Sequence, residues 1–435
     1  MAITFISNYS STNTIYTVGA SVANLDDKSI SMATRLINKI KDDVQPDTSW
    51  NILLEVLEHS FLGISDSSSK YNYQSSINEE TGRKQALHWL ANIDTSSSTL
   101  SEKEYDAGLL QRYALATIYF ATNGDEWTTC SQKEDSSPCE SNDNRYLSPS
   151  SHLKWNGING KNGLVTWLDL SNVNLQSTNF LPLELTLLQV NLEVLWISEN
   201  NQLSGTIPNY IGNEFTNLVS LSIYKTNVGG NIPNSIYNLI KLSSLRLYKS
   251  NFTGEISSDI EKLTELKWLW IHDNNFVGTV PNEIGKLVKL EGVTLHGNQF
   301  TPIVAASSGS STESAAHIEE GVDGGSEKKE EEEKSDDETD EEKTELEKVL
   351  TGEVKEEANV YGNLKSNIIP EGLCHLKKIH LKHLWTDCED DALISTALEG
   401  GKEGKSALVV QEGKQACSCC TRCFPRKEMV AAAIE

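Results

Sequence analysis

The fold is decided by a segment of 24 residues that occurs three times in succession: LVSLSIYKTNVGGNIPNSIYNLIK from Leu218, LSSLRLYKSNFTGEISSDIEKLTE from Leu242 and LKWLWIHDNNFVGTVPNEIGKLVK from Leu266. The copies align without gaps, and equivalent positions carry the same kinds of side chain. Looser copies begin at three further positions, Val165, Leu192 and Leu290. A fixed period of this length predicts a stack of similar structural units.

Each copy opens with the pattern LxxLxL. Leu245 and Leu247 alternate around Arg246, which is typical of a strand with one buried face. A polar residue follows, then a turn that contains Gly, and then a short returning segment; the polar residues are Asn251, Asn274, Asn275 and Asn298. One unit cannot cover its own Leu side chains, whereas stacked units can. The sequence therefore predicts an α/β solenoid with a parallel sheet on its concave side, in which Leu245→Ala costs ~2–5 kcal/mol.

With the pattern LxxLxLxxNxxxGxIP, the stretch Val165–Pro302 resembles the leucine-rich-repeat family, and in particular its plant-type class. The resemblance implies a horseshoe with a concave parallel β-sheet. Two segments before the repeats, ALHWLANID from Ala86 and LLQRYALATIYFATNGDEW from Leu109, are similar to the helical N-terminal cap of leucine-rich-repeat proteins from diatom-like algae. The segments DCEDD and CSCCTRCF (Cys417–Phe424) resemble the Cys-rich C-terminal cap of that group.

These features divide the chain into five regions. We expect a polar, partly helical N-terminal region (1–85), an N-terminal cap (86–164), the leucine-rich repeats (165–302), an acidic disordered insertion (303–358), and a last repeat with the Cys-rich cap (359–435). Helices are expected over Ala33–Val44, Trp50–Ile64 and Asp106–Ala121. Between Glu319 and Glu357 the insertion has 19 acidic residues and 6 Lys, a charge of −13. Such a segment cannot bury enough apolar surface to order itself. The segment LKHLWTDC supplies the last predicted strand.

The eight Cys residues form two groups. In the resembling family the stretch before the first repeat reads C-x-W-x-G-V-x-C, whereas here Leu153 and Gly160 occupy the two Cys positions. Cys130 and Cys139, nine residues apart, are candidates for a small loop disulfide. The other six indicate a disulfide-stapled cap of undetermined connectivity: Cys374, Cys388, Cys417, Cys419, Cys420 and Cys423. Zinc bound by these Cys with His375, His380 and His383 is the alternative, but the Cys spacing is not that of two separate C-x-x-C pairs and the resemblance implies disulfides, so no metal site is predicted.

Composition narrows the function further. The net charge of −25 argues against a nucleic-acid partner. The sequence contains no run of 18 apolar residues, so no transmembrane segment is predicted. The Cys residues and the sequons at Asn8 and Asn251, the latter predicted to carry a glycan, favour an extracellular or cell-surface location. Residues 1–25 nevertheless show no signal peptide. Glu399–Ser406 lacks the first Gly of a phosphate-binding loop, and no other catalytic motif is visible, so neither an enzyme nor a cofactor is expected.

Aromatic and basic residues recur at outward positions of the predicted strands. We expect them to bind a protein, peptide or glycan; the set is Trp196, Tyr224, Lys225, Arg246, Tyr248, Lys249, Trp268, Trp270, His272, His296 and Trp385. Trp, Tyr and Arg are the residues that dominate binding hot spots, and the two His residues predict a binding that depends on pH near 6–7. Alternatively, neighbouring rings only stack on each other across adjacent strands.

The predicted function is therefore recognition through the concave strand face, as in a receptor ectodomain that needs a separate signalling partner. The alternative is a structural, matrix or cell-surface role that acts through the acidic insertion. Binding that is lost on mutation of the strand face favours the first hypothesis. Binding that survives those mutations but is lost on deletion of residues 307–357 favours the second.

Overall fold

The computed structural model describes residues 4–7, 14–17, 25–43, 49–62, 76–96, 102–133, 138–301, 383–387, 394–395, 409–410 and 422–424. The contacts within the chain divide it into two units, Met1–Ile303 with Val360–Glu435, and Val304–Asn359. The second unit lies outside the described residues, and so does the predicted acidic insertion. The same holds for the sequon at Asn8 and for the side chains of the six C-terminal Cys residues. The predicted domain boundaries stay predictions.

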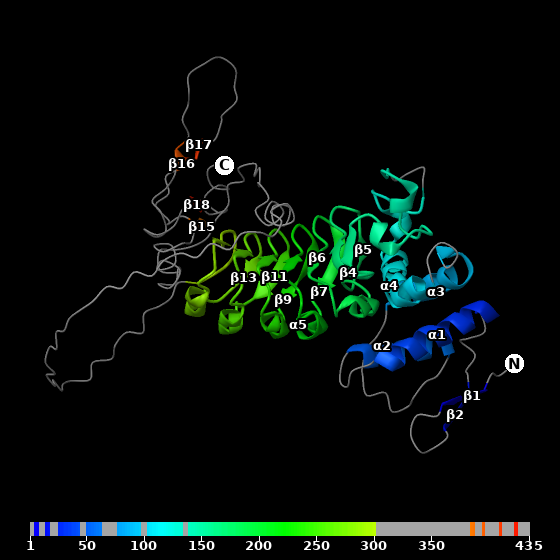
Figure 1. Cartoon of the computed structure of the whole chain (residues 1–435). Coiled ribbons are helices and arrows are strands. Elements are labelled where there is room, and N and C mark those ends of the chain that lie inside the picture. The colour runs from blue at the N-terminus through cyan, green and yellow to red at the C-terminus, as the bar shows by residue number, and fades with distance from the viewer. Residues whose placement is uncertain are drawn as a thin grey trace, which may run out of the picture. The chain divides into compact units, whose positions relative to one another are not determined.

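Among the described residues, four α-helices precede the repeats (Figure 1): α1 (Asp27–Asp43), α2 (Ser49–Leu62), α3 (Ile77–Asn92) and α4 (Glu102–Ala121). The three predicted helices are confirmed by α1, α2 and α4, with ends shifted by at most six residues. Helix α3 begins with a capping box, in which the Ser76 side chain accepts from the Glu79 amide and the Glu79 carboxylate accepts from the Ser76 amide. Both amides lack a partner within the helix. A short hairpin, β1 (Thr4–Ser7) with β2 (Thr14–Thr17), lies before them in the chain.

The repeats form one sheet in which equivalent positions pair. Its strands, in spatial order, are β18 (Arg422–Phe424), β15 (His383–Asp387), β14 (Gly292–Thr294), β12 (Trp268–Trp270), β10 (Ser244–Arg246), β8 (Ser220–Ser222), β6 (Val194–Trp196), β4 (Leu164–Asp169) and β3 (Ile158–Lys161). All neighbours are parallel except β3 and β4, which are antiparallel. Leu221, Leu245 and Leu269 stand side by side, and each is almost fully buried. The predicted α/β solenoid of leucine-rich repeats is confirmed.

A second parallel sheet, which the sequence pattern did not predict, follows the turn of each repeat. It consists of β5 (Gln176–Ser177), β7 (Gln202–Thr206), β9 (Asn227–Asn231), β11 (Asn251–Gly254) and β13 (Asn275–Phe276). The chain returns through short helical segments: η6 (Leu183–Leu188), α5 (Asn209–Glu214), η7 (Asn234–Asn238), η8 (Ser258–Lys262) and η9 (Asn282–Lys286). The remaining elements are η3 (Gly124–Glu126), η4 (Asn142–Asn144), η5 (His152–Lys154), and an antiparallel pair, β16 (Ile394–Ser395) with β17 (Val409–Val410).

Buried amide side chains link successive repeats at the ninth position. The Asn274 side chain donates to the carbonyl of Leu247 over 2.8 Å and accepts from the amide of Phe252 over 3.1 Å. These backbone groups belong to the preceding repeat and are buried, so each needs such a partner. In that repeat Ser250 takes this role, whereas Asn251 is exposed. Asn251 is equivalent to Asn275, which is also exposed, so of the four predicted polar residues only Asn274 and Asn298 occupy the buried ninth position.

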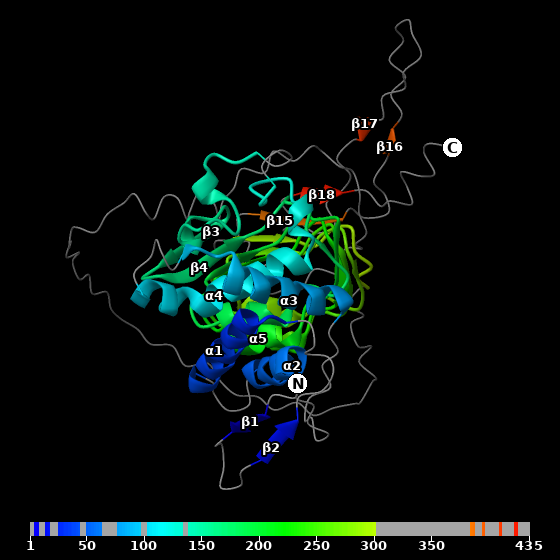
Figure 2. The same cartoon turned by 90° about the vertical axis from the view of Figure 1, so that its right-hand side faces the viewer.

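The helices cover the first repeats (Figure 2). The Gln111 side chain of α4 accepts from the amide of Val165 in β4 over 2.6 Å, beside the strand pair of β3 with β4 that closes this end of the sheet. Arg83 of α3 and Glu184 of η6 form an ion pair of 2.5 Å with both side chains fully buried. An unpaired sheet edge needs a partner, and a buried charge needs an opposite charge. Both needs are met at this end of the solenoid.

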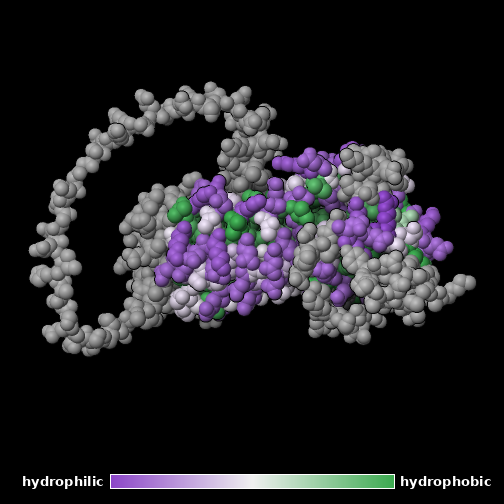
Figure 3. Space-filling model, turned by 60° about the horizontal axis from the view of Figure 1, so that its bottom comes forward, coloured by the Kyte–Doolittle hydropathy of each residue, from purple (hydrophilic) through white to green (hydrophobic). Residues whose placement is uncertain are grey.

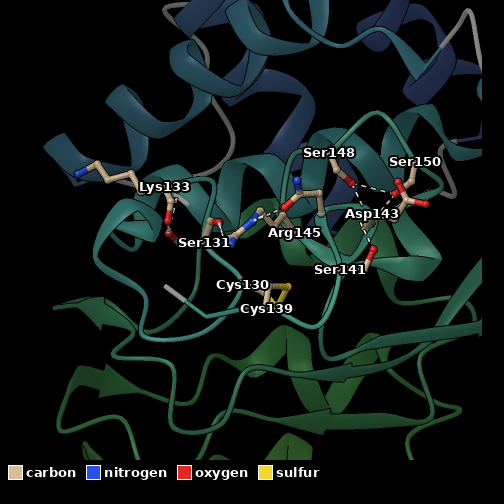
Figure 4. Close-up of a disulfide and its surroundings, with 10 residues drawn as sticks. Cys130, Ser131, Lys133, Cys139, Ser141, Asp143, Arg145, Ser148 and Ser150 are labelled. Atoms are coloured by element: carbon tan, nitrogen blue, oxygen red, sulfur yellow. Dashed lines mark hydrogen bonds between the residues drawn. A yellow bond between two sulfur atoms is a disulfide. The ribbon is translucent and has the colours of Figure 1, made fainter. Parts of the chain in front are cut away.

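A disulfide joins Cys130 and Cys139 (Figure 4), as the spacing of these two residues predicted. Its loop is held at both ends, since the Cys130 amide donates to the carbonyl of Pro138 over 3.0 Å and Arg145 donates to the carbonyl of Ser131 over 2.9 Å. The disulfide therefore closes a loop whose described ends, residues 130–133 and 138–139, are joined to each other and to Arg145.

Within the described part of the chain, no helix is both long and apolar enough to cross a bilayer. The described surface in Figure 3 is mainly hydrophilic, with small and separate hydrophobic areas. The exposed apolar side chains Val190, Ile240 and Val288 come from different repeats. Single exposed apolar residues are ordinary on a protein surface, so the face in Figure 3 gives no indication of an apolar docking site.

Candidate functional site

The strand face ends, in each repeat, at a residue with left-handed backbone. The φ angles are 58° at Glu199, 50° at Lys225, 51° at Lys249, 53° at Asp273 and 67° at Gly297. These residues occupy the eighth position of successive repeats, directly after the outward seventh position. The same turn in every repeat places the seventh side chains in register, one above the other.

Four rings at the seventh position form a continuous stack, the ring ladder, made of Tyr224, Tyr248, His272 and His296. Ring centroids are 4.3 Å apart for Tyr224 and Tyr248, 4.5 Å for Tyr248 and His272, and 4.5 Å for His272 and His296, with interplanar angles of 7°, 11° and 19°. These spacings are close to the distance between neighbouring strands, about 4.8 Å. The rings therefore stack on each other across strands, as the alternative interpretation expects. The ring faces are covered: Tyr248 is 9% exposed and His272 is 2% exposed.

A second cluster lies at the third and fifth positions and combines Trp rings with one cation. The Arg246 guanidinium carbon is 4.6 Å from the Trp270 ring centroid and 5.9 Å from that of Trp196. Trp268 meets Trp270 edge-on at 6.0 Å, and the Trp196 indole donates to the Ser220 hydroxyl over 2.8 Å. Burial lowers the pKa of Arg246, yet a guanidinium keeps its charge in proteins. The cluster, here called the Trp–Arg cluster, thus carries a largely desolvated positive charge between rings.

Two Lys residues border the ring ladder. Lys225 lies 3.6 Å from a carboxylate oxygen of Glu199, with both side chains partly exposed, a pairing worth about 1 kcal/mol or less. Lys225 is also 5.9 Å from the Tyr224 ring, and Lys249 is half-buried. A ligand on the strand face would therefore meet two cationic side chains at one edge.

The expected pH response of the strand face is wrong for His272. Burial, followed by the nearby His296 and Lys249, lowers the pKa of His272 well below its ordinary value. The ring therefore stays neutral between pH 6 and 7. Burial likewise raises the pKa of Tyr248, with Tyr224 adding to the effect, so both Tyr residues present neutral hydroxyls.

The structure brings ten of the eleven predicted site residues together on the strand face, in two clusters and one edge. The backbone of Trp385 pairs beside Thr294 in the same sheet, but its side chain lies outside the described residues. The predicted set omitted Glu199, Ser220 and Asp273. The signal for all three was in the repeat itself, because each occupies a position whose equivalents are on the strand face.

Two stretches, residues 191–213 and 265–287, match the family model described as Leucine Rich Repeat. The chain contains leucine-rich repeats. Among solved structures it is similar to a plant ice-binding protein, with 22% identity over 44% of this chain and 57% of that chain and a TM-score of 0.38. It is also similar to the BIR3–SERK2 complex from Arabidopsis thaliana, with 30% identity over 35% of this chain and 79% of that chain and a TM-score of 0.32.

A third similar structure is the leucine-rich-repeat ectodomain of the Arabidopsis receptor kinase HAESA in complex with a peptide hormone ligand, with 28% identity over 34% of this chain and 33% of that chain and a TM-score of 0.28. The chain thus spans 57% of the ice-binding protein and about a third of the HAESA ectodomain. Curated proteins give no match. At these TM-scores the likeness does not extend to function.

Proposed function

We propose that this protein is a non-enzymatic recognition protein whose strand face binds an extended peptide, or a protein segment, that carries acidic side chains. The observation that carries the proposal is the joining of the ring ladder, the Trp–Arg cluster and two Lys residues on one face. A solenoid presents such a face as an extended binding surface. Trp, Tyr and Arg at the centre of a surface are the residues that contribute most to binding.

The way the rings are covered selects among the three predicted ligand classes. A sugar that stacks on an aromatic side chain needs an uncovered ring face, whereas the faces of Tyr248 and His272 are occupied by their neighbours in the ladder. The outward edges of aromatic rings carry partial positive charge. Together with Arg246, Lys225 and Lys249, these edges favour carboxylates and backbone carbonyls over a neutral glycan.

Electrostatics also favours an acidic ligand at this site. The protein has a net charge of −25, so the long-range field repels acidic ligands from most of the surface. On the strand face Arg246, Lys225 and Lys249 offer an acidic ligand positive groups, although Lys225 is paired with Glu199. Binding should therefore weaken as the salt concentration rises, since Lys225 and Lys249 are at least partly exposed and screened by salt.

An extracellular or cell-surface location is part of the proposal. It is supported by the disulfide between Cys130 and Cys139, because disulfides persist mainly in oxidising compartments. Asn251, the predicted glycan acceptor, is exposed at the start of β11 and thus accessible for modification. A receptor role with a separate signalling partner, and the grouping with proteins of diatom-like algae, stay predictions. No described feature favours the alternative role through the acidic insertion.

A binding experiment with matched charge reversals tests the proposal. Wild-type protein is screened against an array of random 12-residue peptides, and peptides that bind are measured with Lys225→Glu/Lys249→Glu. The control is Lys262→Glu/Lys286→Glu, which changes the net charge equally in the returning segments η8 and η9. We expect Asp- and Glu-rich peptides to bind wild type and control alike, and to bind the strand-face variant at least tenfold more weakly. Equal binding by both variants would contradict the proposed site.

A further inference from the structure

Three potential metal ligands converge at one end of the ring ladder. His272, Asp273 and His296 each offer one ligand atom, a ring nitrogen or a carboxylate oxygen, and these atoms all lie within 4.8 Å of one another. We propose that His272, Asp273 and His296 bind one divalent transition-metal ion of the Zn²⁺ type. The sequence predicted no metal site, because the two His residues are 24 positions apart and meet only when repeats stack.

The distances fit coordination after a small side-chain movement. Zinc binds nitrogen at about 2.0–2.1 Å, so two ligand atoms of a tetrahedral site lie about 3.4 Å apart. The three atoms lie within 4.8 Å of one another, so the most distant pair must approach by up to about 1.4 Å, shared between two side chains. The two imidazole rings are nearly parallel, at 19°, with centroids 4.5 Å apart, so the rings must rotate and tilt for both to direct a lone pair at one ion.

A hydrogen bond orients one of the imidazoles. Nδ1 of His272 lies 2.7 Å from the hydroxyl oxygen of Thr294. Metal-bound His residues usually donate their second ring N–H to such a partner, which fixes the tautomer and the ring orientation. With the proton on Nδ1 and Thr294 accepting it, Nε2 of His272 is the nitrogen that we assign to the metal. At pH 7 an imidazole is mainly neutral and able to coordinate.

The carboxylate is held in place by the backbone at two successive repeats. Asp273 has left-handed backbone, with φ of 53°, at the end of its strand. In the next repeat the equivalent residue is Gly297, where an added Cβ would lie 2.2 Å from Oδ1 of Asp273. Glycine at this position therefore leaves the space that the carboxylate occupies. The equivalent residue before Asp273 is Lys249, so neither neighbouring repeat has a carboxylate at this position.

The donor set matches the chemistry of Zn²⁺ and its neighbours in the first transition series. Two imidazoles and one carboxylate suit zinc, nickel and copper, whereas calcium and magnesium prefer oxygen ligands. Three protein ligands leave a fourth coordination position open. His272 and His296 also belong to the ring ladder of the proposed peptide site. The two proposals are tested separately, because the three metal ligands are not the Lys residues whose reversal tests peptide recognition.

Binding of Co²⁺, Ni²⁺ and Zn²⁺ to the full-length chain tests the site. The protein is made without a polyhistidine tag, and free thiols are alkylated first, because the C-terminal Cys residues are themselves potential ligands. Titration calorimetry gives the stoichiometry and dissociation constant, and Co²⁺ absorption spectra distinguish nitrogen and oxygen ligation from thiolate ligation. The variants are Asp273→Asn and His296→Gln, with His88→Gln as control, since His88 also lies near a carboxylate, 3.6 Å from Asp26.

We expect one metal ion per chain, with affinity at least tenfold weaker in Asp273→Asn and His296→Gln and unchanged in His88→Gln. Thr294→Val, which removes the partner of His272, should weaken binding by about tenfold, the lower end for such supporting groups. Asp273→Asn keeps the shape of the side chain and should fold normally. Circular dichroism of each variant identifies any that fails to fold. Metal binding that is unchanged in all three strand-face variants, or that disappears when thiols are alkylated, would overturn the proposal.

Discussion

Tyr248 occupies the middle of the ring ladder, and its truncation measures how much the ladder stabilises the fold. The ring stacks on Tyr224 at 4.3 Å and on His272 at 4.5 Å and is 9% exposed. Truncating a buried aromatic residue to Ala typically costs about 3–5 kcal/mol. Of this, the two ring contacts account for about 1–3 kcal/mol, at about 0.5–1.5 kcal/mol each. We expect Tyr248→Ala to lower the free energy of unfolding by about 3–5 kcal/mol.

Urea unfolding monitored by far-UV circular dichroism measures this loss, with Tyr248→Phe as the matched control. The Phe variant keeps both ring contacts and removes only the hydroxyl, so it should lose about 1 kcal/mol at most. A shift of the midpoint without a change of slope identifies a change in stability. A loss below about 1 kcal/mol in Tyr248→Ala would refute the view that the stacked rings support the scaffold, and would return them to a purely ligand-binding role.

Three further predictions concern the scaffold. Asn274→Leu leaves a buried carbonyl and a buried amide without their partners, which costs about 1–3 kcal/mol each. The free energy of unfolding in urea should therefore fall by about 2–6 kcal/mol. The control Asn275→Ala changes an exposed residue and should lower it by under about 0.5 kcal/mol. Burial and Arg112 lower the pKa of His152 to about 3. Below pH 6.5 the unfolded chain therefore takes up a proton that the folded chain excludes. Stability should fall by about 2 kcal/mol between pH 6.5 and 5, a loss that His152→Gln removes and exposed His88→Gln does not. Replacing Cys130 and Cys139 by Ala should lower the free energy of unfolding by about 2–3 kcal/mol. The melting temperature of the variant should fall, and reductant should lower that of the wild type in the same way. Equal melting temperatures of the wild type with and without reductant would contradict this.

The parts of the fold that the sequence predicted correctly are those that repeat or that depend on neighbours in the chain. Leu at fixed spacing indicated the strands of the main sheet, because a strand with one buried face imposes that spacing. The helices α1, α2 and α4 followed from local apolar patterns. The pair Cys130 and Cys139 followed from a separation of nine residues, which limits the loop that they close.

The second sheet could not be predicted in this way, for a physical reason. Its strands have two to five residues, too few to show an alternating apolar pattern. They form because the preceding turn is the same in every repeat, with left-handed backbone even at Lys225 and Lys249. Side chains of that kind rarely adopt such angles, so composition alone gives no signal.

The candidate site shows the same division between what can and cannot be predicted. The outward positions of Tyr248 and Trp270 followed from the LxxLxL register, but their exposure did not. In an isolated strand these rings would face water. In the stack each ring covers its neighbour, so that Tyr248 and Arg246 are less than a tenth exposed. Burial of an outward residue depends on which side chain the adjacent repeat places beside it.

Stacking of equivalent positions explains why scaffold and binding surface are not separate on this face. The contacts that stabilise the ring ladder occupy the ring faces, so the proposed ligand would meet the ring edges and the flanking cations. Such a surface is rigid before binding, so little side-chain entropy is lost when a ligand arrives. The same register that aligns Tyr with Tyr also aligns His272 with His296 and sets Asp273 beside Gly297. One repeat spacing thus aligns both the residues of the proposed peptide site along the strands and, at its end, the three proposed metal ligands.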